Sequence, residues 1–215
     1  MSAPRLLDHV VIAGPDLADL VSWFAERTGV VAAPGGAHPT GTANALVALT
    51  VDGQRGPRYV ELISPDPDRV DDVLPTAFGL PELTGPAVVA YAVHPDDIDA
   101  AAAAWRAAGY DPGEVGDLSR RTPDGTLLEW RLTRTERRRA DVPFLIDWGG
   151  TPHPGEGDLP TLEFVSFARV EPDPEPVRAL LAAIGEPEDV GGVVEGEKAG
   201  YRLELRRGDG AHVVL

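Results

Sequence analysis

The sequence predicts an α+β fold in which two strand–helix–strand–strand–strand modules form a curved mixed β-sheet around a cleft. The first observation behind this prediction is a sequence repeat. Residues 6–62 and 88–148 show the same order of strand-like apolar alternation and helical periodicity. The second is the number of turn residues, 24 Gly and 21 Pro, which is typical of many short strands. We expect modules at residues 5–66 and 86–150, with a third, partial module at 159–215.

The helices of the two copies carry matching start and stop signals. Each opens at a Pro-Asp pair and ends at a Gly, and we expect Asp16 and Gly29 to bound the first helix and Asp96 and Gly109 the second. The Pro-Asp pair and the final Gly of the second helix each lie 80 residues after their equivalents in the first. The shared shift supports a true structural repeat.

The closing strands of the modules also align, at residues 57–62 and 143–148. Each opens with a Pro and carries an acid at its fifth place, Glu61 in the first copy and Asp147 in the second. The opening strands align His9 with Val89. Three of the four equivalent positions therefore carry metal-ligand residue types, and the fourth is apolar.

The C-terminal part repeats the pattern in shorter form. A strand is expected at 162–170, then a helix whose apolar face is Val177, Leu180, Leu181 and Ile184 before Gly185. Short strands are expected at 193–194, 201–206 and 212–215. This module either extends the edge of the main sheet or pairs with its copy in a second subunit, so the sequence is compatible with a homodimer.

Composition narrows the class of partner. A formal net charge of -16 repels nucleic-acid backbones and anionic membranes, so we expect neither as a partner and favour a small-molecule ligand. With no cysteine, any metal must be held by His and carboxylates, and no organic cofactor is predicted. No signal-peptide pattern and no run of 18 apolar residues is present, so we expect a cytoplasmic protein.

A candidate metal site follows from strand alternation. His9 shares a strand face with Leu7 and Val11, and Glu61 also has apolar neighbours, so each polar group needs a partner. If the modules curl around one cleft, His9, Glu61 and Asp147 would hold a divalent Zn, Mn, Fe, Ni or Co ion with open positions. The alternative is a hydrogen-bonded pair of His9 and Glu61 without metal.

The segment 35–44 is a candidate substrate-binding rim. It combines Gly residues with His38, Thr42 and Asn44, which could hydrogen-bond a ligand over the cleft. Ordinary turn chemistry explains the same residues equally well. His153, between two prolines after the second closing strand, could approach the cleft and replace the ligand missing at Val89, or simply cap that strand.

Other polar and aromatic residues are interpreted structurally. The basic run 137–139 reads as a solvated loop, and Glu129 with Arg131 as an exposed ion pair. Trp105 and Trp130 are expected in the core.

These motifs resemble the vicinal oxygen chelate superfamily, and within it the bacterial glyoxalase-like domain proteins. The resemblance rests on LDHVV at 7–11, Gly35 and Gly36 with His38, GTAN at 41–44, YVELI at 59–63, PFLIDW at 143–148 and TPHP at 151–154. It implies that the family's four ligand positions fall on His9, Glu61, Val89 and Asp147. It also implies a metal that chelates two neighbouring oxygens, with Glu61 or Asp147 as the catalytic base.

Two functional classes follow from the resemblance and stay open. One is a metal-dependent lyase, isomerase or dioxygenase that acts on a small oxygen-rich metabolite. The other is a metal-free protein that binds or sequesters a small molecule, as bleomycin-resistance proteins do. The fold itself does not separate an enzyme from a binding protein.

Overall fold

The computed structural model describes residues 4–69, 73–134, 142–184 and 192–215. Its three successive modules are β1 (Leu7–Ala13), α1 (Leu17–Thr28), β2 (Ala33–Ala37), β3 (Thr42–Val51) and β4 (Gln54–Pro65); β5 (Ala87–Val93), α2 (Ile98–Ala107), β6 (Glu114–Arg121), β7 (Leu127–Arg134) and β8 (Phe144–Asp147); and β9 (Thr161–Glu171), α3 (Glu175–Ile184), β10 (Gly192–Glu195), β11 (Gly200–Arg206) and β12 (His212–Val214). Two short 3-10 turns, η1 (Ala77–Glu82) and η2 (Pro154–Glu156), follow the first and second modules. The predicted α+β fold is confirmed, and the third module repeats the element order of the first two with shorter closing strands.

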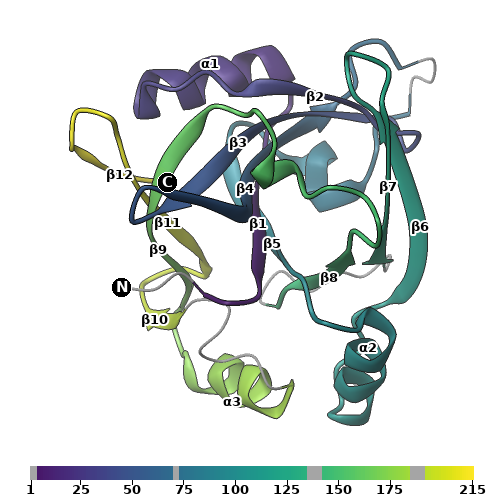
Figure 1. The fold of residues 1–215 in the computed structure, drawn as a ribbon. Helices are drawn as coiled ribbons and strands as arrows, with labels where there is room; N and C mark the ends of the chain where they lie inside the picture. Colours follow the sequence, from purple (N-terminus) through teal and green to yellow (C-terminus); the bar gives the residue numbers. More distant parts are fainter. Residues whose placement is uncertain (1–3, 70–72, 135–141, 185–191) are drawn as a thin grey trace.

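All the strands in the described ranges belong to one sheet, ordered β12-β11-β9-β3-β4-β1-β5-β8-β7-β6, with β10 on β9 and β2 on β3. The two full modules meet where β1 pairs antiparallel with β5, and β1 also pairs parallel with β4. In Figure 1, β1 and β5 run through the middle of the molecule, with β6 and β7 at the right and β11 and β12 at the left. The first strands of both modules are therefore neighbours at the centre.

The third module attaches to the edge of the first. Strand β9 pairs parallel with β3, for example Leu49 with Leu162, and β11 pairs antiparallel with β9. Of the two arrangements expected for this module, the described chain thus adopts the extension of the main sheet. Gly185, the expected end of the third helix, lies outside the described residues.

The first helix follows its sequence signals, and the second departs by one residue. Asp16 caps α1 by accepting a hydrogen bond from the Asp19 N–H at 2.9 Å, and Gly29 ends it in the left-handed conformation at φ 76°. Helix α2 is capped by Asp97 and not by Asp96, through the Ala100 N–H at 2.9 Å. The cap must directly precede the first helical turn, and that turn begins at Ile98, which is buried in the core.

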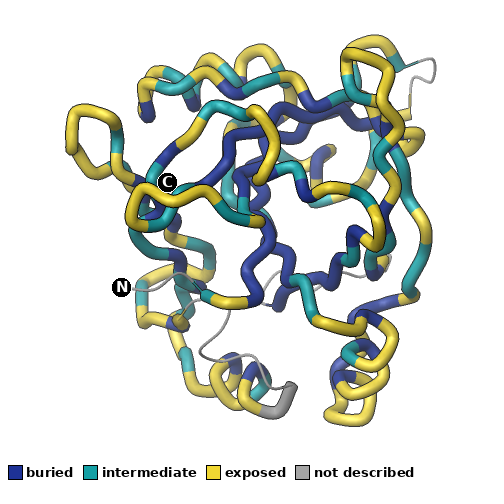
Figure 2. The backbone as a smooth tube through the Cα atoms, viewed as in Figure 1, coloured by how far each residue is buried: buried dark blue, intermediate teal, exposed yellow. Residues whose placement is uncertain are grey.

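The strands separate two apolar layers. One layer packs the sheet against the helices and contains Leu20, Phe24, Ile98, Trp105 and Leu181. The other lies on the opposite side of the central strands and contains Tyr59, Trp130, Phe144, Ile146 and Trp148. Figure 2 shows the buried backbone concentrated in the central strands, with exposed segments in the helices and outer loops.

Trp105 and Trp130 are both in the core, as expected. Trp105 belongs to the first apolar layer, and Trp130 belongs to the second and also lines a cavity. Arg131 pairs with Asp99 at 2.9 Å and not with Glu129, because Asp99 at the start of α2 presents both oxygens to the guanidinium. The basic run 137–139 lies outside the described residues.

No helix in the described part of the chain has both the length and the apolar character needed to cross a membrane.

Candidate functional site

A cleft of about 1140 Å³ lies on the second apolar layer, between strands of both full modules. Its walls include the turn η1, which follows the first module. The lining combines polar groups with a continuous aromatic and aliphatic wall: His9, His38, Thr42, Asn44, Tyr59, Glu61, Val89, Arg120, Trp130, Phe144, Ile146 and Trp148. A concave, mostly apolar site with a few convergent polar groups is the usual form of a small-molecule site.

His9 is oriented by the neighbouring Asp8. Its Nδ1 lies 2.6 Å from Asp8 Oδ1, and both side chains are buried. Burial raises the pKa of Asp8, but hydrogen bonds from His153 and His9 outweigh it and hold that pKa far below its usual range. Because Asp8 is therefore a carboxylate, the Nδ1–H of His9 donates to it, and His9 Nε2 is directed toward the cleft.

Glu61 is held in the same cleft from its other side. The Asn44 Nδ2–H donates to Glu61 Oε1 at 2.7 Å, which leaves Oε2 3.7 Å from His9 Nε2. When His9 is neutral, both of these atoms carry lone pairs. Two buried lone-pair atoms that face each other require a positive charge between them, either a proton or a metal ion.

Tyr59 stacks on His9, with ring centroids 4.5 Å apart and an angle of 18° between the planes. Burial, with the negative charges of Asp8 and Glu61, raises the pKa of Tyr59 well above its ordinary value. Tyr59 therefore keeps its phenolic proton over the whole physiological pH range.

The expected rim at 35–44 is instead a hairpin with buried side chains. Residues 33–37 form β2, the Gly41 N–H donates to the His38 carbonyl at 3.0 Å, and β3 follows at Thr42. His38, Thr42 and Asn44 are all buried and all line the cleft. The segment is thus an ordered wall of the cleft, because strand pairing with β3 extends through Ala37.

His38 is held as a neutral imidazole beside Glu61. Its Nδ1 lies 2.9 Å from Thr42 Oγ1, and its ring meets Trp130 edge-on at 6.0 Å. Burial lowers the pKa of His38; Arg120 lowers it further, and Glu61 opposes the shift. The depressed pKa keeps His38 uncharged at neutral pH.

The two glycines of β2 are required by close approaches. A Cβ at Gly35 would lie 2.1 Å from Asn44 Oδ1, the side chain that holds Glu61. At Gly36, where φ is +134°, a Cβ would lie 2.1 Å from the carbonyl oxygen of Arg121 on β6. The Gly pair thus lets the first module close against the second at one end of the cleft.

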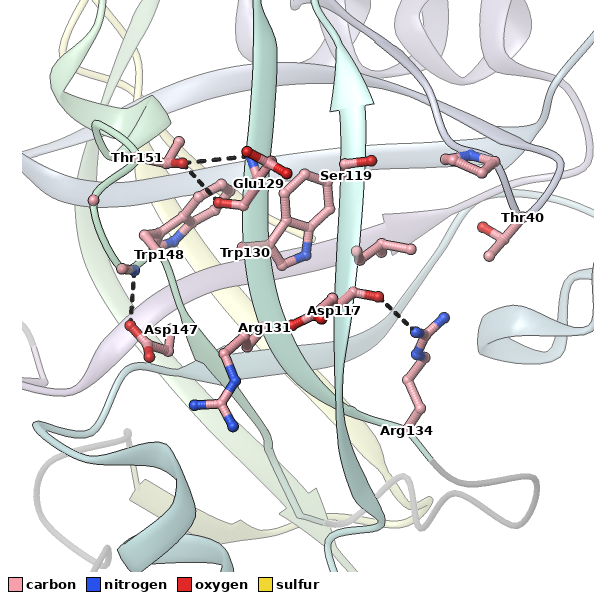
Figure 3. Close-up of a pocket in the computed structure, with 14 residues that line it drawn as sticks. Thr40, Asp117, Ser119, Glu129, Trp130, Arg131, Arg134, Asp147, Trp148 and Thr151 are labelled. Carbon is pink, nitrogen blue, oxygen red and sulfur yellow. Dashed lines mark hydrogen bonds between the residues drawn. The ribbon is translucent and has the colours of Figure 1, made fainter.

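Asp147 does not join His9 and Glu61. On β8 the side chains of Phe144 and Ile146 line the cleft, as does that of Trp148 directly after the strand, so alternation turns Asp147 to the other face of the sheet. There it lines a more open cavity of about 840 Å³ and accepts a hydrogen bond from the Gly149 N–H at 2.8 Å (Figure 3).

Val89 lines the cleft, as its alignment with His9 implies. It lies at a register shift of the β1–β5 pairing, between Ala90, which pairs with Val11, and Val88, which pairs with Ile12. Its aliphatic side chain adds to the apolar wall. The second module therefore has no imidazole at this place.

His153 lies behind the cleft and not in it. Its Nε2 is 3.1 Å from Asp8 Oδ2, and its Nδ1 accepts a hydrogen bond from the Gly155 N–H at 3.0 Å. Both ring nitrogens are occupied, so His153 does not replace the ligand missing at Val89. It supports Asp8, which also accepts a hydrogen bond from Trp148 Nε1 at 3.0 Å.

The sequence reasoning missed Asp8 and Arg120. Asp8 is a fully buried acid that stands with His9 among the apolar residues of β1, and that placement was the available signal. Arg120 is 4% exposed and lies two residues after Leu118 on β6, so both side chains line the cleft. The same face of β6 also carries Glu114 and Gly116, so strand alternation gave no comparable signal for Arg120.

The donor atoms fit a two-ligand metal site and not the expected three-ligand centre. Ligand atoms bound at about 2.0–2.2 Å to one ion lie roughly 3–4 Å apart, which matches the 3.7 Å between His9 Nε2 and Glu61 Oε2. A carboxylate behind the histidine, here Asp8, is the usual support of such a ligand. Within the described ranges, however, no group of three His, Asp or Glu side chains is placed to hold a metal ion.

Among solved structures, a hypothetical protein from Staphylococcus aureus matches with a TM-score of 0.63 and 13% identity, covering 97% of both chains. This likeness concerns the fold. Methylmalonyl-CoA epimerase from Mycobacterium tuberculosis matches at a TM-score of 0.40 and 20% identity, over 68% of this chain and 89% of its own. Methylmalonyl-CoA epimerase from Streptomyces coelicolor, solved with 2-nitronate-propionyl-CoA, matches at a TM-score of 0.43 and 22% identity. The match covers 71% of this chain and 100% of the epimerase chain.

No curated protein matches the sequence. The family model of the glyoxalase-like domain, by contrast, matches residues 7–185, which contain both full modules, the cleft and the beginning of the third module. The chain therefore belongs to the glyoxalase-like domain family and has the vicinal oxygen chelate fold that its repeated modules resemble.

Proposed function

We propose that the chain is an enzyme, a lyase or isomerase, that moves a proton on a small oxygen-rich molecule with the help of a divalent metal ion held by His9 and Glu61. The observation that carries this proposal is the 3.7 Å separation of His9 Nε2 and Glu61 Oε2. Each of the two side chains is held from behind, by Asp8 and by Asn44. The positive charge that the pair needs would be the metal ion.

The protein's own residues have distinct roles in this proposal. Asp8 keeps the proton of His9 on Nδ1, so that Nε2 remains a lone-pair donor. Asn44 holds Oε1 of Glu61, and Oε2, the oxygen that would share the ion with His9, would accept the substrate proton through its second lone pair. When bound, a divalent ion polarises two neighbouring substrate oxygens and so acidifies the adjacent C–H bond.

The remaining walls favour this chemistry because they are largely apolar. Phe144, Trp130 and Ile146 supply an apolar surface beside the polar pair, and Phe144 meets the His9 ring edge-on at 5.4 Å. A low local dielectric strengthens the interaction of Glu61 with any positive charge nearby. The protonated Tyr59, stacked on His9, keeps a hydroxyl donor at the same wall.

A metal-free binding protein is the second candidate, and the second module favours it. Val89 and Ile146 give the cleft no ligand from that module, and Asp147 lies on the other face of β8. In this case a proton on His9 supplies the positive charge between His9 and Glu61. The cleft would then bind a small molecule without changing it.

The test combines metal content with proton exchange. The full chain and the Glu61→Gln and His9→Ala variants are purified without a tag and assayed for metal. Each is then incubated in D₂O with α-oxoaldehydes, 2-oxo acids and 2-hydroxy acids, and deuterium at the carbon beside the oxygen is followed by NMR. Glu61→Gln is the informative variant, because its amide oxygen can still accept the Asn44 hydrogen bond.

The proposal predicts near-stoichiometric metal in the native protein, loss of metal in both variants, and exchange that disappears with Glu61→Gln. General-base removal typically reduces the rate by about 10²–10⁴-fold. Ligand binding with neither metal nor exchange would establish the second candidate and rule out the first.

A further inference from the structure

Arg120 is a buried cation in the wall of the cleft. It lies on β6, is 4% exposed, and alternates with Leu118 on the cleft face. Its Nη1–H donates to the carbonyl of Gly35 on β2, so the guanidinium is held between the two full modules. The group is therefore positioned before any ligand arrives.

No described carboxylate forms an ion pair with Arg120. Burial lowers the pKa of Arg120, and the negative charge of Glu61 opposes this shift only in part. A guanidinium carries five N–H donors, and the bond to Gly35 uses one of them. A buried charge without a carboxylate partner is costly unless a ligand supplies one.

Arg120 and Glu61 occupy different places in one cleft, so one can bind an anionic group while the other takes a proton. Both side chains line the cavity, and they attract each other without forming an ion pair. A ligand that carries an anionic group at Arg120 could present its neighbouring carbon and oxygen toward Glu61 and His9. The formal net charge of -16 disfavours the binding of anionic ligands elsewhere on the protein. An anionic ligand would therefore depend on a local cation such as Arg120.

We infer that Arg120 binds the carboxylate of the substrate, and that the substrate class is small carboxylic acids with an oxygen on the carbon next to the carboxylate. This inference rests on the proposed function and narrows its substrate. Planar, bidentate recognition of a carboxylate is the interaction for which a preorganised guanidinium is best suited. An apolar substituent of the acid would contact Phe144 and Trp130.

The test uses matched charged and neutral probes, mandelate and mandelamide, which differ only in the carboxylate. Their binding to the full chain is measured through the fluorescence of the cleft tryptophans, Trp130 and Trp148. The variants are Arg120→Gln and Arg120→Lys, with Arg134→Gln as the control. Arg134 also lines the cleft but is exposed, and it donates to the Asp117 carbonyl at 2.9 Å.

We expect the native protein to bind mandelate at least about tenfold more tightly than mandelamide, since a charge-assisted bidentate pair contributes roughly this much. Arg120→Gln should reduce the preference below about twofold, Arg120→Lys should retain part of it, and Arg134→Gln should leave it unchanged. If Arg120→Gln does not fold, as judged by circular dichroism, the comparison of Arg120→Lys with Arg134→Gln decides.

Equal binding of the two probes to the native protein, binding of neither, or a preference that survives in Arg120→Gln would overturn the inference. The Glu61→Gln variant separates this outcome from the proposed function. It lacks the proposed metal site but retains Arg120, so its preference for mandelate should remain. If Glu61→Gln loses the preference for mandelate while Arg120→Gln keeps it, the carboxylate binds at the metal, and the role of Arg120 is contradicted.

Discussion

The first and second modules share one order of strands and helix but contribute different chemistry to the cleft. The first supplies the polar pair His9 and Glu61, with Asn44, and the second supplies the apolar wall of Phe144 and Trp130 and the cation Arg120. The pairing of β1 with β5 brings the two contributions together. Repetition of a backbone pattern therefore predicts a shared cavity and does not predict shared ligands.

The difference arises from which strand face carries each acid. On β4, Glu61 alternates with Val60 and Leu62, which pack on the helix side, so Glu61 faces the cleft. On β8, the cleft face is occupied by Ile146, and Asp147 is displaced by one residue. A shift of one residue reverses the side of the sheet on which a side chain lies.

Asp8→Asn should have the largest effect and tests whether the two modules depend on one buried charge. Asp8 accepts hydrogen bonds from His9, Trp148 and His153. An asparagine has only one oxygen that can accept, and its amide N–H group would face at least one of these donors. We expect a loss of about 3–5 kcal/mol in the free energy of unfolding, measured with urea at pH 7. Asp96→Asn, at an exposed residue, should change it by less than about 0.5 kcal/mol.

The pH dependence sharpens this prediction. The pKa of Asp8 in the folded state is depressed below its unfolded value of about 3.9. Its stabilising contribution is therefore complete above pH 4 and is lost as the pH falls through the folded pKa. The native protein should lose stability in this acid range, and Asp8→Asn should lack that part of the loss. Parallel acid profiles for the two proteins would contradict the assignment.

Glu61→Gln and Asp147→Asn compare the two aligned acids directly. Glu61 faces His9, whereas Asp147 lies on the opposite face of β8 and lines the other cavity. Affinity for Zn²⁺, measured by competition with a chromogenic chelator, should fall about 100-fold or more in Glu61→Gln, equivalent to about 2.7 kcal/mol. It should change less than about twofold in Asp147→Asn. Equal losses would mean that both modules supply ligands.

Gly36→Ala tests the contact that closes the cleft between β2 and β6. The new Cβ meets the Arg121 carbonyl and the backbone has φ +134°, so we expect a loss of about 1–3 kcal/mol in the free energy of unfolding. The control is Gly41→Ala, where φ is +84° but nothing lies within 4 Å of the added Cβ. The difference between the two variants isolates the contact from the backbone strain. Identical losses would show that the contact does not matter.

Val89→His should have the smallest effect, a gain, by restoring the symmetry of the modules. An imidazole at this cleft position offers one more ligand beside His9 and Glu61. We expect Zn²⁺ affinity to rise about tenfold, or about 1.4 kcal/mol, in the same competition assay. Val89→Asn, which adds a polar group without an imidazole, is the control. Unchanged affinity in Val89→His would indicate that β5 lies too far from the pair.

Sequence reasoning found the fold through local signals and found about half of the site. The caps at Asp16 and Gly29 and the cleft side chains His9 and Glu61 lie where periodicity indicated. The cap of α2 was predicted one residue too early, at Asp96 in place of Asp97. Asp147 was predicted to face the cleft, but it lies on the other face of β8. Such one-residue errors are tolerated in a description of elements but decide which side chains meet.

The sequence alone determined the modules, their order, and the residue types available for chemistry, because helix caps, turn residues and apolar periodicity act over a few neighbouring residues. Only the tertiary structure decided which of these side chains share a cavity. The pairing of Asp8 with His153, and the bond of Arg120 to Gly35, join residues 145 and 85 positions apart. Contacts at such separations depend on strand register and sheet curvature, and local sequence patterns do not specify either.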